Sequence, residues 1–182
     1  MNEVYQVFIS FKNKDFEGNP SEDSRVAEKL YEELMNHGIS AFFSNVKLLE
    51  LGSAAYKSSI EKAIDSANVM IVIGSCPEFL ETEWVTYERE SFHNDVLSGL
   101  KKDACIVPYL GNFESSRVPR CLRGYETFSL ANHTPTDVVN FVEHFLKKNA
   151  ERTEKVNEKC LAYAKERNST FSHKIEKTQI KS

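Results

Sequence analysis

Residues 69–74 read VMIVIG, six consecutive positions without a polar side chain. A run of this length that is rich in β-branched residues is typical of a strand. A strand with one face in water alternates polar and apolar residues, whereas a strand of a parallel sheet is covered on both faces. We therefore expect residues 69–74 to form a strand of a parallel sheet that has helices on both sides.

Further strands are expected on either side of this run. Residues 4–11, 39–43 and 105–110 have strand-like sequences, and residues 124–130 form a weaker fifth candidate. Pro108 lies inside the fourth candidate and indicates an end or edge position, because proline cannot donate to a strand ladder.

Helical patterns lie between the first four strands and after the fifth. The first pattern carries Val26, Leu30 and Leu34 on one stripe and ends before Gly38. The third continues to about Leu100 as one long helix. The four patterns begin near Arg25, Ser53, Pro77 and Thr134. This alternation of strands and helices favours an α/β fold, in which ligands bind beyond the carboxyl ends of the strands.

The composition of the 182-residue chain is that of an ordinary globular protein, with 27% charged residues and a net charge of −4. No basic excess is available to bind nucleic acid or an anionic membrane. The four cysteines form no C-x-x-C pair, which argues against a zinc ribbon or a disulfide framework. The N-terminus is not basic and the longest apolar run is strand-length, so we expect a cytoplasmic protein without signal peptide or membrane span.

The last 33 residues differ from the rest in being polar and charged. Residues 151–167 can form a helix that carries Val156, Cys160, Leu161 and Tyr163, and residues 168–182 read as a frayed tail. We therefore expect one domain over residues 1–149 and a charged helical or frayed extension over residues 150–182.

One carboxylate stands out on the helix that follows residues 69–74. Trp84 and Glu88 are one turn apart on one stripe, beside an apolar stripe that contains Val85 and Phe92. A carboxylate at the edge of an apolar face is partly desolvated, which suits catalysis. From spacing alone, a solvated helix glutamate is the more common reading. The sequence contains no Walker A loop, G-x-G-x-x-G, G-x-S-x-G or H-E-x-x-H motif.

Six segments and one motif, taken in order, carry a family resemblance. The segments are residues 7–11 (VFISF) with Asp15, 38–43 (GISAFF), 46–52 (VKLLELG), 59–64 (SIEKAI), 69–75 (VMIVIGS) and 106–108 (IVP). The most specific feature is the W-x-x-x-E motif that Trp84 and Glu88 form. Over about residues 4–148 the chain thereby resembles the Toll/interleukin-1 receptor (TIR) domain family.

The resemblance implies a flavodoxin-like five-stranded parallel sheet with helices on both faces. Some TIR enzymes cleave NAD⁺ at the nicotinamide–ribose bond, and in them the glutamate of the motif, here Glu88, is catalytic. Trp84 would line the same pocket. The substrate would contact residues at the ends of the first two strands, namely Ser10, Phe11, Lys12, Phe43 and Ser44. NAD⁺ is then the substrate, and we expect no cofactor and no metal.

The products implied are nicotinamide with ADP-ribose, or a cyclic or transferred ADP-ribose signal, as in bacterial anti-phage or stress signalling. The resemblance also implies self-association of TIR domains and a downstream effector protein. Leu48, Leu49 and Leu51 in the BB loop are the expected assembly surface. The loop over residues 12–24 is longer than is usual in the family.

Two alternatives remain open at the level of sequence. The first is a non-catalytic TIR–TIR interaction module that uses the same BB-loop leucines. The second is an enzyme resembling nucleoside deoxyribosyltransferases, which share the fold and a glutamate nucleophile. Fold alone does not choose among these functions.

Overall fold

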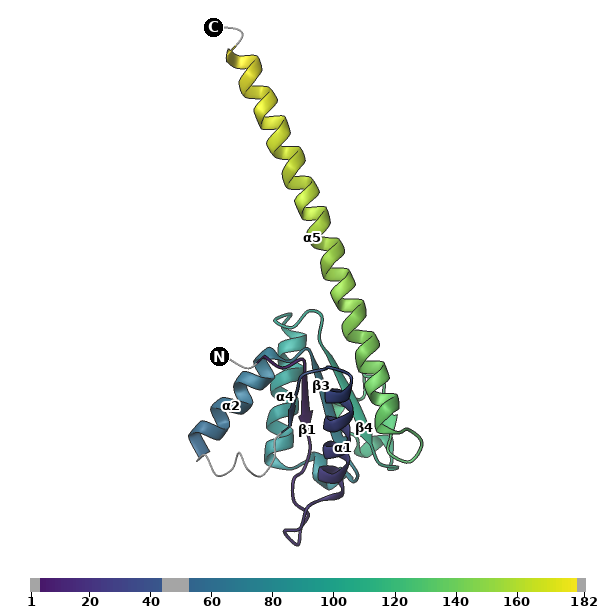
Figure 1. The fold of residues 1–182 in the computed structure, drawn as a ribbon. Helices are drawn as coiled ribbons and strands as arrows, with labels where there is room; N and C mark the ends of the chain where they lie inside the picture. Colours follow the sequence, from purple (N-terminus) through teal and green to yellow (C-terminus); the bar gives the residue numbers. More distant parts are fainter. Residues whose placement is uncertain (1–3, 44–52, 180–182) are drawn as a thin grey trace. The chain divides into compact units, whose positions relative to one another are not determined.

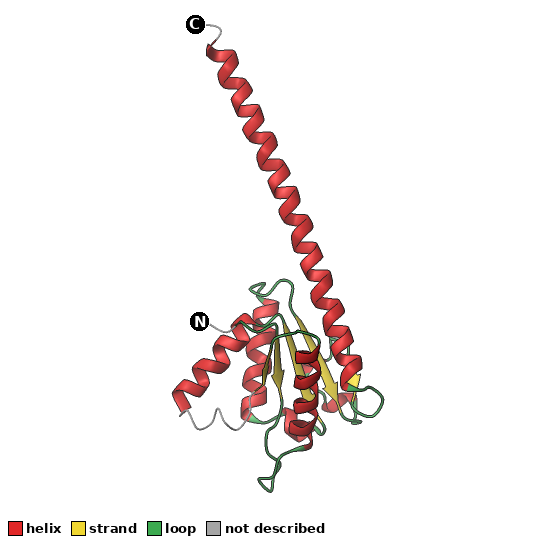
Figure 2. Cartoon of the chain, viewed as in Figure 1, coloured by secondary structure: helices red, strands yellow, loops and turns green. Residues whose placement is uncertain are grey.

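The computed structural model describes residues 4–43 and 53–179 of the chain. Within them a five-stranded sheet has the order β2-β1-β3-β4-β5, and every pair of neighbouring strands is parallel (Figures 1 and 2). The strands are β1 Val7–Ser10, β2 Ala41–Phe43, β3 Val69–Gly74, β4 Cys105–Leu110 and β5 Phe128–Ser129. This arrangement confirms the expected α/β fold.

The first four helices connect the first four strands, and the fifth helix follows the last strand. They are α1 Glu22–Asn36, α2 Ser53–Ser66, α3 Pro77–Leu80, α4 Glu83–Leu97 and α5 Pro135–Gln179, with short 3-10 turns at Ser115–Arg117 and Arg120–Leu122. The prediction of a single long helix from Pro77 is wrong, because the helical segment is interrupted between α3 and α4. Thr82 has an extended backbone at this break, and its hydroxyl donates to the Phe79 carbonyl at 3.0 Å.

Both faces of the sheet are buried, as the unbroken apolar run of β3 predicted. On one face, Phe8, Met70 and Val72 pack in a cluster with Ile60 of α2 and Phe92 of α4. The alternate residues of the same strands point the opposite way and are also fully buried. They are Val7, Ile9, Val69, Ile71 and Ile73. Buried apolar side chains of α1 and of the start of α5 supply the remaining core.

Pro108 lies in β4, which is an inner strand and not an edge strand, but only one side of β4 is paired at this residue. It pairs with Val72 of β3 on one side. On the other side, the short β5 pairs only with Tyr109 and Leu110. The missing donor of the proline is therefore tolerated, because the β5 side of β4 is unpaired at this residue.

The ends of α1 and the start of α5 follow the predicted capping patterns. Gly38 has a φ of 71° directly after α1, and the Ile39 amide donates to the Leu34 carbonyl at 2.9 Å. At α5, the Thr134 amide and hydroxyl both donate to Asp137 Oδ2 at 2.7 Å. The predicted start of this helix is confirmed.

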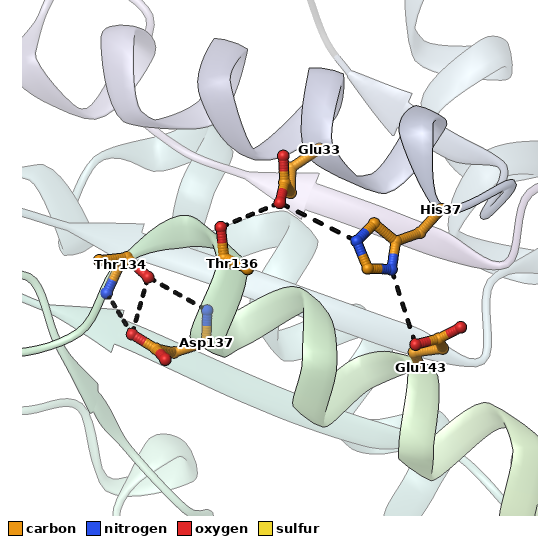
Figure 3. Close-up of polar contacts among 6 residues, drawn as sticks. All are labelled: Glu33, His37, Thr134, Thr136, Asp137 and Glu143. Carbon is orange, nitrogen blue, oxygen red and sulfur yellow. Dashed lines mark hydrogen bonds and ion pairs between the residues drawn. The ribbon is translucent and has the colours of Figure 1, made fainter.

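Polar contacts join α1 to the first turns of α5 (Figure 3). The Thr136 hydroxyl donates to Glu33 Oε1 at 2.9 Å. His37 lies 3.9 Å from Glu33 and 3.6 Å from Glu143. These partly exposed contacts link α1 to the first turns of α5.

The chain divides into two compact units, residues 1–143 and 144–182. The second unit continues α5 without a break to Gln179, past residue 168, where we expected fraying. No proline or glycine follows Pro135, so nothing in the sequence ends the helix. None of the described helices combines the length and the apolar character that a membrane span requires.

Candidate functional site

The candidate site lies where β1 and β3 end, at the carboxyl edge of the sheet. In Figure 1 the β1 arrow points toward this edge, and the loop between β1 and α1 lies there as well. Ser10 is the last residue of β1, and its side chain is on the same face as Phe8 because strand residues alternate. The helix α4 packs on that face, so Ser10 is directed toward α4.

Ser10 and Glu88 meet in the interior although they are 78 residues apart in the chain. The Ser10 hydroxyl donates to Glu88 Oε2 at 2.7 Å. Glu88 is 4% exposed and Ser10 is fully buried. The structure thus brings together two of the predicted site residues and buries the glutamate more deeply than its helical spacing suggested.

Burial raises the pKa of Glu88 to about 8, and the hydrogen bond from Ser10 lowers it by a smaller amount. Within the described residues no cation forms an ion pair with this carboxyl. Glu88 is therefore mostly protonated at neutral pH. A cation that entered the site would favour the ionised carboxylate, because opposite charges lower the pKa of an acid.

Trp84 lies one turn before Glu88 but is directed outward. It is 45% exposed, and its ring is edge-on to Tyr87 at 6.2 Å. Tyr87 in turn donates to Glu61 Oε1 at 3.1 Å and has the Lys57 ammonium 5.6 Å from its ring centre. Trp84 thus belongs to an outer aromatic and charged surface of α4, while Glu88 belongs to the interior.

The remaining predicted contact residues fall into two groups. Phe11 and Phe43 are stacked with ring centres 5.3 Å apart, and Tyr31 of α1 stacks on Phe43 at 5.3 Å. Phe11 is buried in this stack, so its ring serves packing. Lys12 is half-exposed, and its carbonyl accepts a hydrogen bond from the Ser21 hydroxyl. Four further predicted residues lie outside the described residues: Ser44, Leu48, Leu49 and Leu51.

Asp23 is a buried acid at the same edge that the sequence reasoning missed. Its Oδ1 accepts from the Ser75 amide at 2.8 Å, just beyond β3. Its Oδ2 is buried without a hydrogen-bond partner among the described residues, and burial raises its pKa. The sequence feature that could have revealed Asp23 is Ser21, the N-cap of α1, whose hydroxyl accepts a hydrogen bond from the Ser24 amide at 2.9 Å. Because we placed the helix start at Arg25, Asp23 was assigned to the loop.

Arg89 is a second buried charge that the sequence reasoning missed. Its Nη1 donates to the Leu80 carbonyl at 2.7 Å, and its Nη2 lies 3.8 Å from the exposed Glu90. The Arg89 side chain therefore spans the break between α3 and α4, and no ion pair with Glu88 is found among the described residues. No group of three or more metal-binding side chains occurs in the described part of the chain.

Comparison with known families agrees with this fold. The family model described as TIR domain matches residues 7–145, which include the whole sheet. No curated protein matches the chain.

Proposed function

Because the chain belongs to the TIR domain family, we propose that it cleaves the nicotinamide–ribose bond of NAD⁺. The observation that carries this proposal is the buried Glu88 held by Ser10 at the carboxyl edge of the sheet. A carboxyl group with a strongly raised pKa at the ligand edge of an α/β sheet is a functional-site candidate on physical grounds.

The chemistry needs only one carboxylate. In NAD⁺ the nicotinamide is a cationic pyridinium, and it takes the electron pair of the broken bond and leaves as a neutral molecule. Glycosidases that expel an alkoxide need a separate acid, and this reaction does not. Ionised Glu88 stabilises the positive charge that develops on the ribose, and Ser10 holds the carboxylate in place. Water then bonds to the ribose carbon and releases one proton, which gives ADP-ribose.

The cationic nicotinamide ring provides the positively charged partner that Glu88 lacks among the described residues of the free protein. Its approach lowers the pKa of the carboxyl, so substrate binding and ionisation of Glu88 are coupled. If a nucleophile other than water reaches the ribose, the product is a cyclic or transferred ADP-ribose. Self-association and an effector protein that reads the product are part of the same proposal.

The test is to incubate the full chain at high concentration with NAD⁺ and to separate the products by chromatography. We expect nicotinamide in equal amount to an ADP-ribose product, and none from NADH, whose dihydronicotinamide ring is neutral. Base exchange on deoxynucleosides without nicotinamide release would instead support the deoxyribosyltransferase-like alternative. Absence of turnover in both the dilute protein and forced oligomers would refute the proposal.

A second candidate is a TIR–TIR interaction module without catalysis. The observation that favours it is the same burial of Glu88, because a protonated acid bonded to a serine can simply complete a core. In that case Glu88→Gln would leave self-association unchanged, and nicotinamide would never be released.

A further inference from the structure

The loop between β1 and α1 contains an ordered hairpin over residues 13–20. Lys14 and Pro20 form an antiparallel bridge, and the Ser21 amide donates to the Asn13 carbonyl at 3.1 Å. Inside the turn, Asp15 Oδ1 accepts from two backbone amides, each at 2.9 Å. Gly18 has a φ of 88°, which L side chains rarely adopt, so the turn needs glycine there.

This hairpin carries Phe16, whose ring is 75% exposed. One side of the ring contacts Phe79 of α3, with ring centres 5.4 Å apart and an interplanar angle of 47°. Phe79 itself is buried behind it. Phe16 is thus an aromatic group held from one side and open to solvent on the other.

Phe16 lies at the edge of the sheet where ligands of α/β folds bind. Among the residues up to Glu143 whose side-chain burial the structure describes, Phe16 and Trp84 are the two exposed members of the Phe, Trp and Tyr residues. Both belong to the carboxyl edge of the sheet, Phe16 through the loop after β1 and Trp84 through the first turn of α4. Other exposed apolar residues of this unit are scattered aliphatic ones, which need no explanation.

We propose that Phe16 stacks on the adenine ring of the NAD⁺ that Glu88 cleaves, so that the hairpin binds the half of the dinucleotide that does not react. This inference rests on the proposed function. The nicotinamide ribose must lie at Glu88, which Ser10 contacts. Phe16 is six residues further along the chain and packs on α3 instead of α4, so it suits the distant base.

The physical basis is stacking on a ring that is already ordered. Stacking of a base on an aromatic side chain contributes about 1–3 kcal/mol. The hairpin is ordered before the ligand binds, because two backbone amides donate hydrogen bonds to Asp15 and because Phe16 contacts Phe79. Little conformational entropy is therefore lost on binding. Lys12 is half-exposed and lies between Ser10 and Phe16 in the sequence, so in this binding mode it would supply positive charge for the diphosphate.

The test is to measure how the full chain binds the two halves of the dinucleotide, AMP and nicotinamide mononucleotide, by titration calorimetry. We expect Phe16→Ala to weaken AMP binding by about 5- to 150-fold, the range that stacking predicts. Phe16→Tyr should retain it. Binding of nicotinamide mononucleotide should be the same in all three proteins. The matched control is Met35→Ala, because Met35 is an exposed apolar residue near the opposite end of α1.

Three results would overturn the inference: no AMP binding by the wild-type chain, equal AMP affinity in the wild type and Phe16→Ala, or a change of oligomeric state in Phe16→Ala that accounts for the difference. These outcomes are distinct from failure of the proposed function. AMP binding that depends on Phe16 without nicotinamide release would refute the cleavage reaction alone. Nicotinamide release with unchanged AMP affinity would refute the role of Phe16 alone.

Discussion

Replacing Glu88 by glutamine should make the protein more stable at neutral pH. Burial raises the pKa of Glu88 from its ordinary value of 4.5 to about 8. In the unfolded chain this carboxyl loses its proton as the pH rises above 4.5, while in the folded protein it keeps the proton until about pH 8. The stability contributed by the neutral acid is therefore fully present below pH 4.5 and is lost progressively up to pH 8. Glutamine cannot ionise and still offers an oxygen to the Ser10 hydroxyl.

The size of the effect follows from the two pKa values. Each pH unit over which the two states differ by one proton changes the free energy of unfolding by about 1.4 kcal/mol. Between pH 4.5 and pH 7 the wild type should lose about 3 kcal/mol relative to Glu88→Gln. Groups other than Glu88 titrate in both proteins and cancel in the difference.

The assay is urea unfolding of both proteins at half-unit steps of pH, analysed by linear extrapolation. The matched control is Glu90→Gln, which removes an exposed glutamate from the same helix. This variant loses the 3.8 Å ion pair with Arg89, but it should not reproduce the relative gain of about 3 kcal/mol between pH 4.5 and pH 7. Parallel curves for the wild type and Glu88→Gln would refute the reasoning, because they would show that Glu88 is not buried as a neutral acid.

Three further predictions concern catalysis and packing. If ionised Glu88 is the acting form, kcat/KM for NAD⁺ should rise about tenfold per pH unit below pH 8 and level off above it, as steady-state rates would show. A Cβ on Gly111 would lie 2.2 Å from the Ser75 carbonyl oxygen, so Gly111→Ala should lower the free energy of unfolding by at least about 2 kcal/mol. Gly124→Ala, with nothing within 4 Å, should be nearly neutral in the same urea experiment. Lys101→Met should cost about 2 kcal/mol in thermal or urea unfolding, because the Lys101 ammonium donates to two carbonyls at the end of α2 at 2.7 and 2.8 Å.

The fold was predictable because each strand is encoded by a short local pattern of apolar residues. The unbroken apolar run of β3 already required cover on both faces, and Gly38 marked the end of α1 through its left-handed backbone. The break at Thr82 was not predictable from the apolar pattern, which continues across it. It depends on a hydroxyl that bonds to Phe79 and on Arg89, which bonds to Leu80 from the next helix.

The candidate site was predictable only in part. Helical spacing placed Glu88 and Trp84 on one stripe, yet one is 4% and the other 45% exposed. Their difference arises from Ser10, a partner 78 residues away, and no local periodicity contains that contact. Asp23 and Phe16 were missed for a related reason, since each is defined by a contact with the segment after β3. Residues whose role depends on such long-range contacts need the folded structure.

The measurement that tests the central claim most directly is the rate of nicotinamide release from NAD⁺ by the wild type, Glu88→Gln and Glu90→Gln at equal concentration. The account predicts that Glu90→Gln matches the wild type, whereas Glu88→Gln loses at least about 100-fold, as expected when a group that stabilises transition-state charge is removed. The pH-stability experiment shows that the variant is folded. Equal nicotinamide release by the wild type and Glu88→Gln would contradict the account, because the reaction would then not depend on the buried carboxylate.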